Sequence, residues 1–200
     1  VRYAFEYAQA QAKARKKSIH FILSTNGWSL SDERLEWLKT LPVKLELSLD
    51  GAERTQTRFR PAGKWIGGNS YENSIVPTAK AIQASGIPYD VIMVVHPKAV
   101  GDMADNFFHI ADMGFRRIQI NFALGFRWRE EQKQTFAAQL MLIGKELRKR
   151  WANGEQLDMV NLDGRPMKMR LNAEITVDWD GTVYGGNGFL HETENKEKFR

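Results

Sequence analysis

The sequence of 200 residues contains no cysteine. This absence excludes disulfides, a thiolate nucleophile, and any zinc site or iron–sulfur cluster that the chain itself would ligate through cysteine. No apolar run approaches the roughly 20 residues that cross a bilayer, and no signal peptide is recognisable. We therefore expect a cytoplasmic protein that has no membrane as a partner.

The sequence also lacks the features that divide or specialise a chain. No linker rich in proline, glycine or serine interrupts it, so its length predicts one ordinary domain with at most a small accessory module. No phosphate-binding loop, paired-carboxylate motif or Ser-His-Asp ordering stands out. The four histidines show no short-range metal-ligand spacing, and we expect no metal ligand in this chain.

The basic residues are dispersed, although the net charge is +5. They gather where helices are expected to end, as in residues 13–17 and 148–150, and cations there complement the helix dipole. A nucleic-acid footprint would need basic residues clustered on one face. We therefore expect no nucleic-acid partner.

Four short apolar runs rich in Val, Ile and Leu end abruptly in polar residues, and a helix-patterned stretch follows each run. Strands that alternate with helices build a parallel sheet, and such sheets bind ligands at the carboxyl ends of their strands. The pattern predicts an α/β fold with a curved, mostly parallel sheet and outer helices, which is a partial (β/α) barrel. The predicted strands are Ser18–Leu23, Val43–Leu47, Tyr89–Val95 and Arg117–Phe122.

Helices are predicted between the strands from apolar spacing, caps and stop residues. They cover residues 1–17, about 31–41, 72–85, about 103–113 and 129–151. The polar segment from Asp50 to Tyr71 is predicted as a long loop, a length that is usually functional or mobile. The chain opens at Val1 inside a helical pattern, without Met or a capping residue, so we expect an upstream part of a larger protein.

A different pattern begins after residue 160. Residues 169–177 and 182–184 read as strands around Asp178-Trp179-Asp180-Gly181, a β-hairpin signal that is strongest at Asp180-Gly181. We therefore predict two parts, a barrel-like domain over residues 1–160 and an extension that contains the hairpin over residues 161–200.

The polar residues at the predicted strand ends suit a polar ligand more than hydrolytic acid–base chemistry. They offer hydroxyl, amide and carboxylate groups, and Arg60 in the long segment can clamp a carboxylate in bidentate fashion. Each alone has an ordinary interpretation, since Asn26-Gly27 and Asp50-Gly51 are common turn formers. Their shared position at one rim favours a common site. The candidates are Thr25, Asn26, Ser48, Asp50, Arg60 and Asn121, with His96 as a further candidate.

The order of these segments resembles the radical S-adenosylmethionine superfamily. Within it, the similarity is to the peptide- and protein-modifying branch with a cysteine-rich, SPASM-like C-terminal extension, such as sulfatase-maturing enzymes. The resemblance covers the chain from its first helix through Asn121, and residues 177–184 resemble the start of the extension. The segments that carry it are Ser24-Thr25-Asn26-Gly27, Ser48-Leu49-Asp50-Gly51, Arg60 and Gly68-Asn69-Ser70-Tyr71.

This resemblance implies a partial (β/α)₆ barrel that binds S-adenosylmethionine. Residues matching Asn26, Ser48 and Arg60 contact the methionine or ribose part of the cofactor in that family. By position, Thr25, Asp50 and Asn121 join the same set, and His96 would lie near the adenine or the substrate.

The chain departs from the family in its metal chemistry. It lacks the Cys-x-x-x-Cys-x-x-Cys loop and the glycine-rich loop that binds the amino group of the cofactor, and Gly185-Gly186-Asn187 stands where the extension usually has a cysteine. Without three thiolates no [4Fe–4S] cluster is held and no electron reaches the cofactor. We therefore expect this chain alone to be inactive. The missing N-terminal segment would give the parent enzyme the cluster for radical chemistry on a peptide or protein substrate.

Two alternatives stay open. One is a non-catalytic relative of the barrel that binds a small ligand or peptide without iron chemistry, which the missing cysteine in the hairpin favours. The other is an unrelated α/β hydrolase or sugar-binding barrel, in which Arg60 would have no role in S-adenosylmethionine binding.

Overall fold

The computed structural model describes residues 2–28, 30–61, 71–164, 175–178 and 180–184. The chain divides into two compact units, Val1–Asp163 and Gly164–Arg200, and each is described by itself. Within the described residues, no helix is both long enough and apolar enough to cross a membrane.

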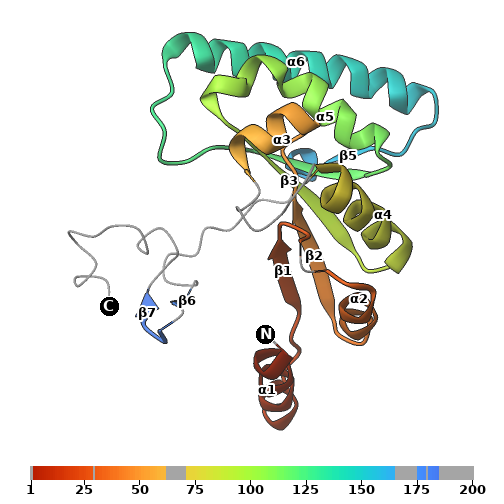
Figure 1. The fold of residues 1–200 in the computed structure, drawn as a ribbon, viewed down its shortest axis with the longest axis vertical. Coiled ribbons are helices and arrows are strands. Elements are labelled where there is room, and N and C mark those ends of the chain that lie inside the picture. The colour runs from red at the N-terminus through yellow and green to blue at the C-terminus, as the bar shows by residue number, and fades with distance from the viewer. Residues whose placement is uncertain (1, 29, 62–70, 165–174, 179, 185–200) are drawn as a thin grey trace. The chain divides into compact units, whose positions relative to one another are not determined.

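The first unit is built on a five-stranded sheet in which neighbouring strands are parallel and follow the chain order (Figure 1). The predicted α/β class, with a parallel sheet and outer helices consistent with a partial barrel, is confirmed. The first strand begins and ends later than predicted, and the short fifth strand was not predicted. The strands are β1 (Phe21–Thr25), β2 (Val43–Ser48), β3 (Tyr89–Val95), β4 (Arg117–Phe122) and β5 (Asp158–Met159).

Helices connect the strands, as the spacing of apolar residues predicts. The helices are α1 (Arg2–Ala14), α2 (Asp32–Lys39), α3 (Glu53–Phe59), α4 (Val76–Ser85), α5 (Met103–Asp112) and α6 (Glu130–Ala152). Three shorter helical segments are η1 (Tyr71–Ile75), η2 (Pro97–Asp102) and η3 (Val160–Leu162).

Pro77 lies in the first turn of α4, where its missing N–H costs nothing, and Gly86 ends that helix in a left-handed conformation with φ +74°.

The prediction of one long loop from Asp50 to Tyr71 is wrong in its first part, because residues 53–59 form α3. The sequence of α3 is Glu-Arg-Thr-Gln-Thr-Arg-Phe, which has no apolar stripe, so periodicity could not reveal it. Two of its polar residues, Thr55 and Gln56, are buried. Residues 62–70 of the predicted loop lie outside the described residues.

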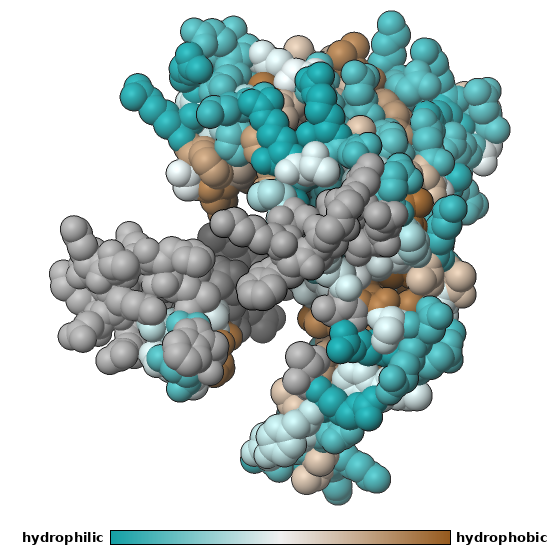
Figure 2. Space-filling view, in the orientation of Figure 1, coloured by the Kyte–Doolittle hydropathy of each residue, from teal (hydrophilic) through white to brown (hydrophobic). Residues whose placement is uncertain are grey.

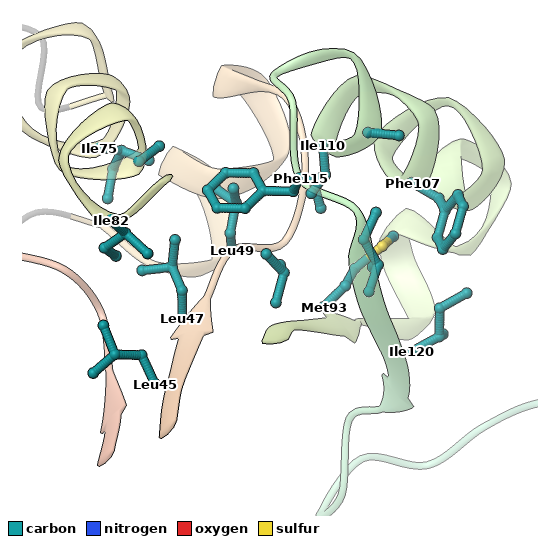
Figure 3. Packing of buried hydrophobic residues seen from close by; sticks show 14 of the residues in the cluster. Leu45, Leu47, Leu49, Ile75, Ile82, Met93, Phe107, Ile110, Phe115 and Ile120 are labelled. Carbon is teal, nitrogen blue, oxygen red and sulfur yellow. The ribbon is translucent and has the colours of Figure 1, made fainter. Parts of the chain in front are cut away.

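The sheet has one apolar face that packs against the helices. Leu45, Leu47 and Ile118 alternate along their strands with more polar residues, Met93 lies in the apolar run of β3, and all four are fully buried. Figure 3 shows Leu47 of β2 beside Ile82 of α4. The rest of this core comes from the helices, chiefly Leu38, Phe107, Ile110, Ile143 and Leu147.

The opposite face of the sheet is mostly polar, and one row of polar and charged side chains crosses all five strands on it. Ser24 Oγ donates to Glu46 Oε2 over 2.8 Å, and Glu46 lies beside Asp90 in the strand register. Arg117 donates from Nε to Asp90 Oδ1 over 2.9 Å and from Nη1 to Asp158 Oδ2 over 3.0 Å. Lys44 and Asp163 add ion pairs to Asp90 and Arg117, respectively. This polar row keeps the uncovered face wettable, so the helices need to cover only one side of the sheet.

The second unit contains the predicted hairpin, which is confirmed. Strand β6 (Thr176–Val177) pairs antiparallel with β7 (Val183–Tyr184). Asp178 N–H donates to Thr182 O over 2.8 Å, and Gly181 takes φ +86° in the turn. Residues 169–174 of the longer predicted strand lie outside the described residues.

A glycine at the end of β2 is expected to be essential for folding. Gly51 has φ +134°, and a Cβ there would lie 2.2–2.4 Å from the side chain of Asn106. Gly51→Ala therefore combines backbone strain with a core clash, and we expect a loss of at least about 2 kcal/mol in the free energy of unfolding by urea denaturation. Gly144→Ala in α6 is the matched control, because nothing lies within 4 Å of its Cβ position. The control is expected to gain up to about 1 kcal/mol. Equal effects of the two substitutions would contradict this explanation.

Candidate functional site

The end of β2 carries a buried carboxylate that several elements share. Asp50 is 4% exposed, and its Oδ1 accepts a hydrogen bond of 3.0 Å from the backbone N–H of Val94 in β3. Its own N–H donates to Gln56 Oε1 in α3 over 2.8 Å. Arg60 neutralises its charge by donating from Nε to Oδ2 over 2.7 Å and from Nη2 to Oδ1 over 3.1 Å. A buried charge is tolerated when it is paired and hydrogen-bonded in this way.

Helix α3 brings Arg60 back to Asp50, ten residues earlier in the sequence. Arg60 directly follows the helix, and its backbone N–H bonds to Gln56 O over 2.8 Å. Of the five N–H groups of a guanidinium, only two are used on Asp50. The Arg60 side chain is 30% exposed, so its other donors can reach a ligand. The carboxylate that Arg60 clamps in the structure belongs to Asp50 of the protein itself. That Arg60 clamps the carboxylate of a ligand stays a prediction.

A cavity of about 280 Å³ opens beside this pair at the carboxyl ends of β2, β3 and β4. It is lined by Asp50, Arg58, Phe59, Arg60, Val94, His96, Ala123 and Phe126. Its walls combine two arginine side chains with aromatic rings, which suits a ligand with a planar ring and an anionic or hydroxyl-bearing part.

His96 stands between two aromatic side chains in this cavity. Its ring stacks on Phe59 with centroids 4.4 Å apart and meets Phe126 edge to face, also at 4.4 Å. Its Nδ1 accepts the backbone N–H of Lys98 over 3.0 Å. Burial, followed by Lys98 and Arg58, lowers the pKa of His96 below its ordinary value. The neutral ring with its proton on Nε2 can therefore donate a hydrogen bond to a ligand near pH 7.

Two further predicted residues lie on the polar face of the sheet near this cavity. Ser48 is the last residue of β2 and pairs in register with Ile92. Asn121 in β4 pairs in register with Val94, and its Oδ1 accepts a hydrogen bond of 2.9 Å from Gln119. Val94 also lines a second cavity, of about 600 Å³, together with Asn121. The structure thus brings Asp50, Arg60 and Asn121 together around Val94.

The two predicted residues at the end of β1 have local roles in the structure. Thr25 Oγ1 accepts the N–H of Gly27 over 3.1 Å, and Asn26 Oδ1 accepts the N–H of Trp28 over 3.2 Å. These bonds form the turn that follows the strand. Thr25 lines a different cavity, of about 650 Å³, next to α2. The cavity at Asp50 includes neither residue.

Sequence reasoning missed the residues that hold the turn at Asp50 in place. Asn106 of α5 is 3% exposed and accepts the N–H of Ala52 over 3.0 Å. The hydroxyl of Tyr71 lies 2.7 Å from His109 Nε2 and 3.4 Å from the carbonyl oxygen of Gly51. Burial, with Glu72 and Glu53 nearby, raises the pKa of Tyr71 to about 12, so the hydroxyl keeps its proton. A polar Asn between apolar residues of one helix face was the available signal for Asn106.

The residues present do not fit an iron–sulfur cluster. The sequence has no cysteine, and the described residues contain no group of three or more His, Asp or Glu side chains able to hold a metal ion.

The Asp50–Arg60 pair is expected to act as a unit in stability. Arg60→Ala leaves a buried carboxylate with one backbone donor, and we expect a loss of about 3 kcal/mol in the free energy of unfolding. Asp50→Asn is expected to cost about 1–2 kcal/mol, because Asn can still accept from Val94 and the exposed part of Arg60 can be hydrated. In urea unfolding, the double variant should lose clearly less than the sum of the two. Additive losses would show that the two side chains are not coupled.

The stability of the fold is expected to depend on the protonation of His96. Because its pKa in the folded state lies below the reference value of 6.5, its contribution to stability is complete above pH 6.5 and is lost as the pH falls through the folded-state pKa. His96→Asn keeps an acceptor for the N–H of Lys98 but does not titrate. The free energy of unfolding of the wild-type chain should fall more steeply between pH 7 and pH 5 than that of the variant. Parallel pH profiles would contradict the interpretation.

No protein-family model matches the sequence, and no curated protein matches it. Solved structures share its fold. The structure of anSMEcpe with bound AdoMet has a TM-score of 0.71 and 14% identity over 92% of this chain and 55% of that one. The structure with bound AdoMet and the Cp18Cys peptide has a TM-score of 0.75 and 15% identity over 99% and 59%.

A third solved structure, SuiB from Streptococcus suis, is less similar. Its TM-score is 0.57 and its identity 11%, over 92% of this chain and 47% of SuiB. The chain thus spans about half the length of the two proteins compared, anSMEcpe and SuiB. At these identities the similarity establishes the fold, which is the one that the sequence pattern predicts.

Proposed function

We propose that this chain forms part of a protein of the radical S-adenosylmethionine superfamily, that it binds S-adenosylmethionine at the carboxyl ends of its strands, and that the whole protein acts on a peptide or protein. The observation that carries the proposal is the cavity at the ends of β2–β4, where Arg60 is held against buried Asp50 beside the His96 ring. Two findings support it. The fold is that of anSMEcpe, which was solved with AdoMet, and the sequence motifs resemble those of the superfamily.

The donors and acceptors of the site match the parts of the cofactor. The N–H groups of Arg60 that Asp50 does not use would bind the carboxylate of the methionine part. Asp50 in the cavity wall and Ser48, the last residue of β2, would offer oxygen atoms to ribose hydroxyls, and Asn121 would offer an amide from the next cavity. The aromatic walls beside His96 would hold the base. In this proposal Thr25 and Asn26 set the turn at the end of β1 and complete the rim.

The proposal for this chain is limited to binding. When a [4Fe–4S] cluster is present, it supplies the electron that cleaves S-adenosylmethionine, and this sequence has no thiolate to hold one. The residues described here would bind the cofactor, orient it and exclude water from it. The peptide as substrate is supported by anSMEcpe structures that carry the Cp18Cys and Kp18Cys peptides. The hairpin unit, residues 164–200, is proposed as the SPASM-like extension.

A second function, binding without iron chemistry, is favoured by the complete absence of cysteine. In such a relative, the same cavity would hold S-adenosylmethionine or a related nucleoside as a ligand. The two functions share the binding step and differ in whether the complete gene product takes up iron. Iron analysis after anaerobic reconstitution of that product separates them, since about four iron atoms per chain belong only to the enzyme.

Calorimetry with S-adenosylmethionine tests the shared binding step. The wild-type chain should bind it, and Arg60→Ala should weaken binding at least about tenfold by removing a charged hydrogen bond. Ser48→Ala is a milder second variant at a position where no described residue bonds the hydroxyl, and it should weaken binding about threefold. Arg148→Ala, an exposed change near the end of α6, is the control for charge and should bind as wild type.

Circular dichroism must first show that each variant is folded at the assay temperature. No binding by the folded wild-type chain, or equal binding by folded Arg60→Ala and Arg148→Ala, would reject the cofactor proposal.

A further inference from the structure

Among the described residues, no strand pairs with the far edge of β4 at its carboxyl end. Strand β5 pairs only with Arg117 and Ile118, whereas β3 pairs along β4 as far as Phe122. At Ile120 the side chain of Asn161 takes the place of a strand, accepting the N–H over 2.8 Å and donating to the carbonyl over 2.9 Å. Because backbone groups in a strand alternate sides, Phe122 presents its N–H and C=O to this same edge. No described residue pairs with Phe122 there.

Two cavities flank the open edge, and the wall of the larger one also includes Asn121 and Asn161. One of about 310 Å³ is lined by Phe122, Trp128, Lys133 and Phe136. The larger cavity of about 600 Å³ shares Phe122 and Phe136 and adds Leu124. Phe122 is 57% exposed and Leu124 is 78% exposed. Figure 2 shows apolar side chains gathered over the loop between β4 and α6.

The rim of this edge is positively charged. Residues 122–129 contain Arg127 and Arg129 and no carboxylate, and neither arginine forms an ion pair with a described residue. Lys133 in the wall of the smaller cavity pairs with Glu130 over 3.2 Å. Glu130 and Glu131 lie in the first turn of α6, where acidic residues complement the helix dipole.

We propose that the edge of β4 at Phe122 binds an extended peptide that carries alternating apolar and acidic side chains. The peptide adds a strand beyond Asn161, so its backbone pairs with Phe122 and its apolar side chains enter the cavities beside the edge. Its carboxylates face Arg127 and Arg129. The inference rests on the proposed function only where this peptide is taken as the substrate, and the docking itself needs no cofactor.

The charge of the rim decides between a peptide and a second copy of this chain. An exposed edge is also a template for edge-to-edge pairing of identical chains. Such pairing would bring the arginines of two copies together, and like charges at an interface oppose association. The same arginines would attract the carboxylates of an acidic peptide and so strengthen its binding.

The test uses an array of ten-residue fluorescent peptides in which Leu, Phe or Val alternates with Glu or Asp. Fluorescence anisotropy with the whole chain should reveal binding members, and replacement of their acidic residues by Lys should weaken binding at least tenfold at low salt. N-methylation of the peptide amides that face the edge of β4 should abolish binding. N-methylation of the intervening amides, which point away from that edge, should be tolerated. No binder in the array, or equal loss from both methylation patterns, would overturn the proposal.

Variants of the protein test the same edge. Arg127→Glu combined with Arg129→Glu should weaken peptide binding at least tenfold, and the loss should shrink at high salt. The matched control is Lys145→Glu with Arg148→Glu, two exposed positions roughly 22 Å or more further along α6. Equal loss in both double variants would reject the assigned edge. A salt-resistant dimer in sedimentation velocity that excludes the peptides would assign the edge to a second copy instead.

The cofactor variants separate this inference from the proposed function. A folded Arg60→Ala chain should still bind the peptides. If the wild-type chain binds the peptides but not S-adenosylmethionine, only the cofactor site is rejected. If it binds S-adenosylmethionine but none of the peptides, only the peptide edge is rejected.

Discussion

The turn from Asp50 to Ala52 fixes the relative positions of four elements, and the candidate site depends on it. The Asp50 carboxylate accepts from β3 at Val94 and from Arg60 after α3, while Asn106 of α5 accepts the N–H of Ala52. Gly51 has the backbone angle and the space that this close approach to α5 requires. Because the carboxylate is buried and charged, losing any of its donors is costly, so the turn has few alternative conformations. Arg60 is therefore positioned before any ligand arrives.

The two faces of the sheet explain why this junction lies at an open rim. All helices with residues in the core pack on the apolar face, and the other face carries the polar row centred on Asp90 and Arg117. Asp90 is 2% exposed and is balanced by Lys44 and Arg117. Asp90 and Arg117 lie near the amino ends of β3 and β4 and pair with each other, whereas Asp50, Arg60 and Asn121 lie towards the carboxyl ends.

The sequence was sufficient for the four longer strands of the sheet, with β1 displaced by a few residues, because alternation and apolar runs are local signals. They predicted β2, β3 and β4 almost to the residue and the placement of Asp50 at a strand end. They could not show that Gln56 and Asn106 hold this turn, because those contacts depend on folding and Asn106 lies more than fifty residues away. Helix α3 was missed because its buried side chains, Thr55 and Gln56, are polar and therefore give no apolar periodicity. Ser48, Arg60 and Asn121 fall near one rim, whereas Thr25 and Asn26 are engaged in their own turn.

Strand β4 connects the two proposed binding regions. Asn121 points to the polar face and lines the cavity that shares Val94 with the Asp50 site, while the next residue, Phe122, presents the open edge. A strand places consecutive residues on opposite sides, so one short segment can serve a cofactor and a peptide at once. A peptide added at Phe122 would lie next to the cavity lined by Val94 and Asn121. The sequence has no thiolate. Under the proposed function, the contribution of this chain is therefore proximity, because the proposed cofactor site and the proposed peptide edge share strand β4.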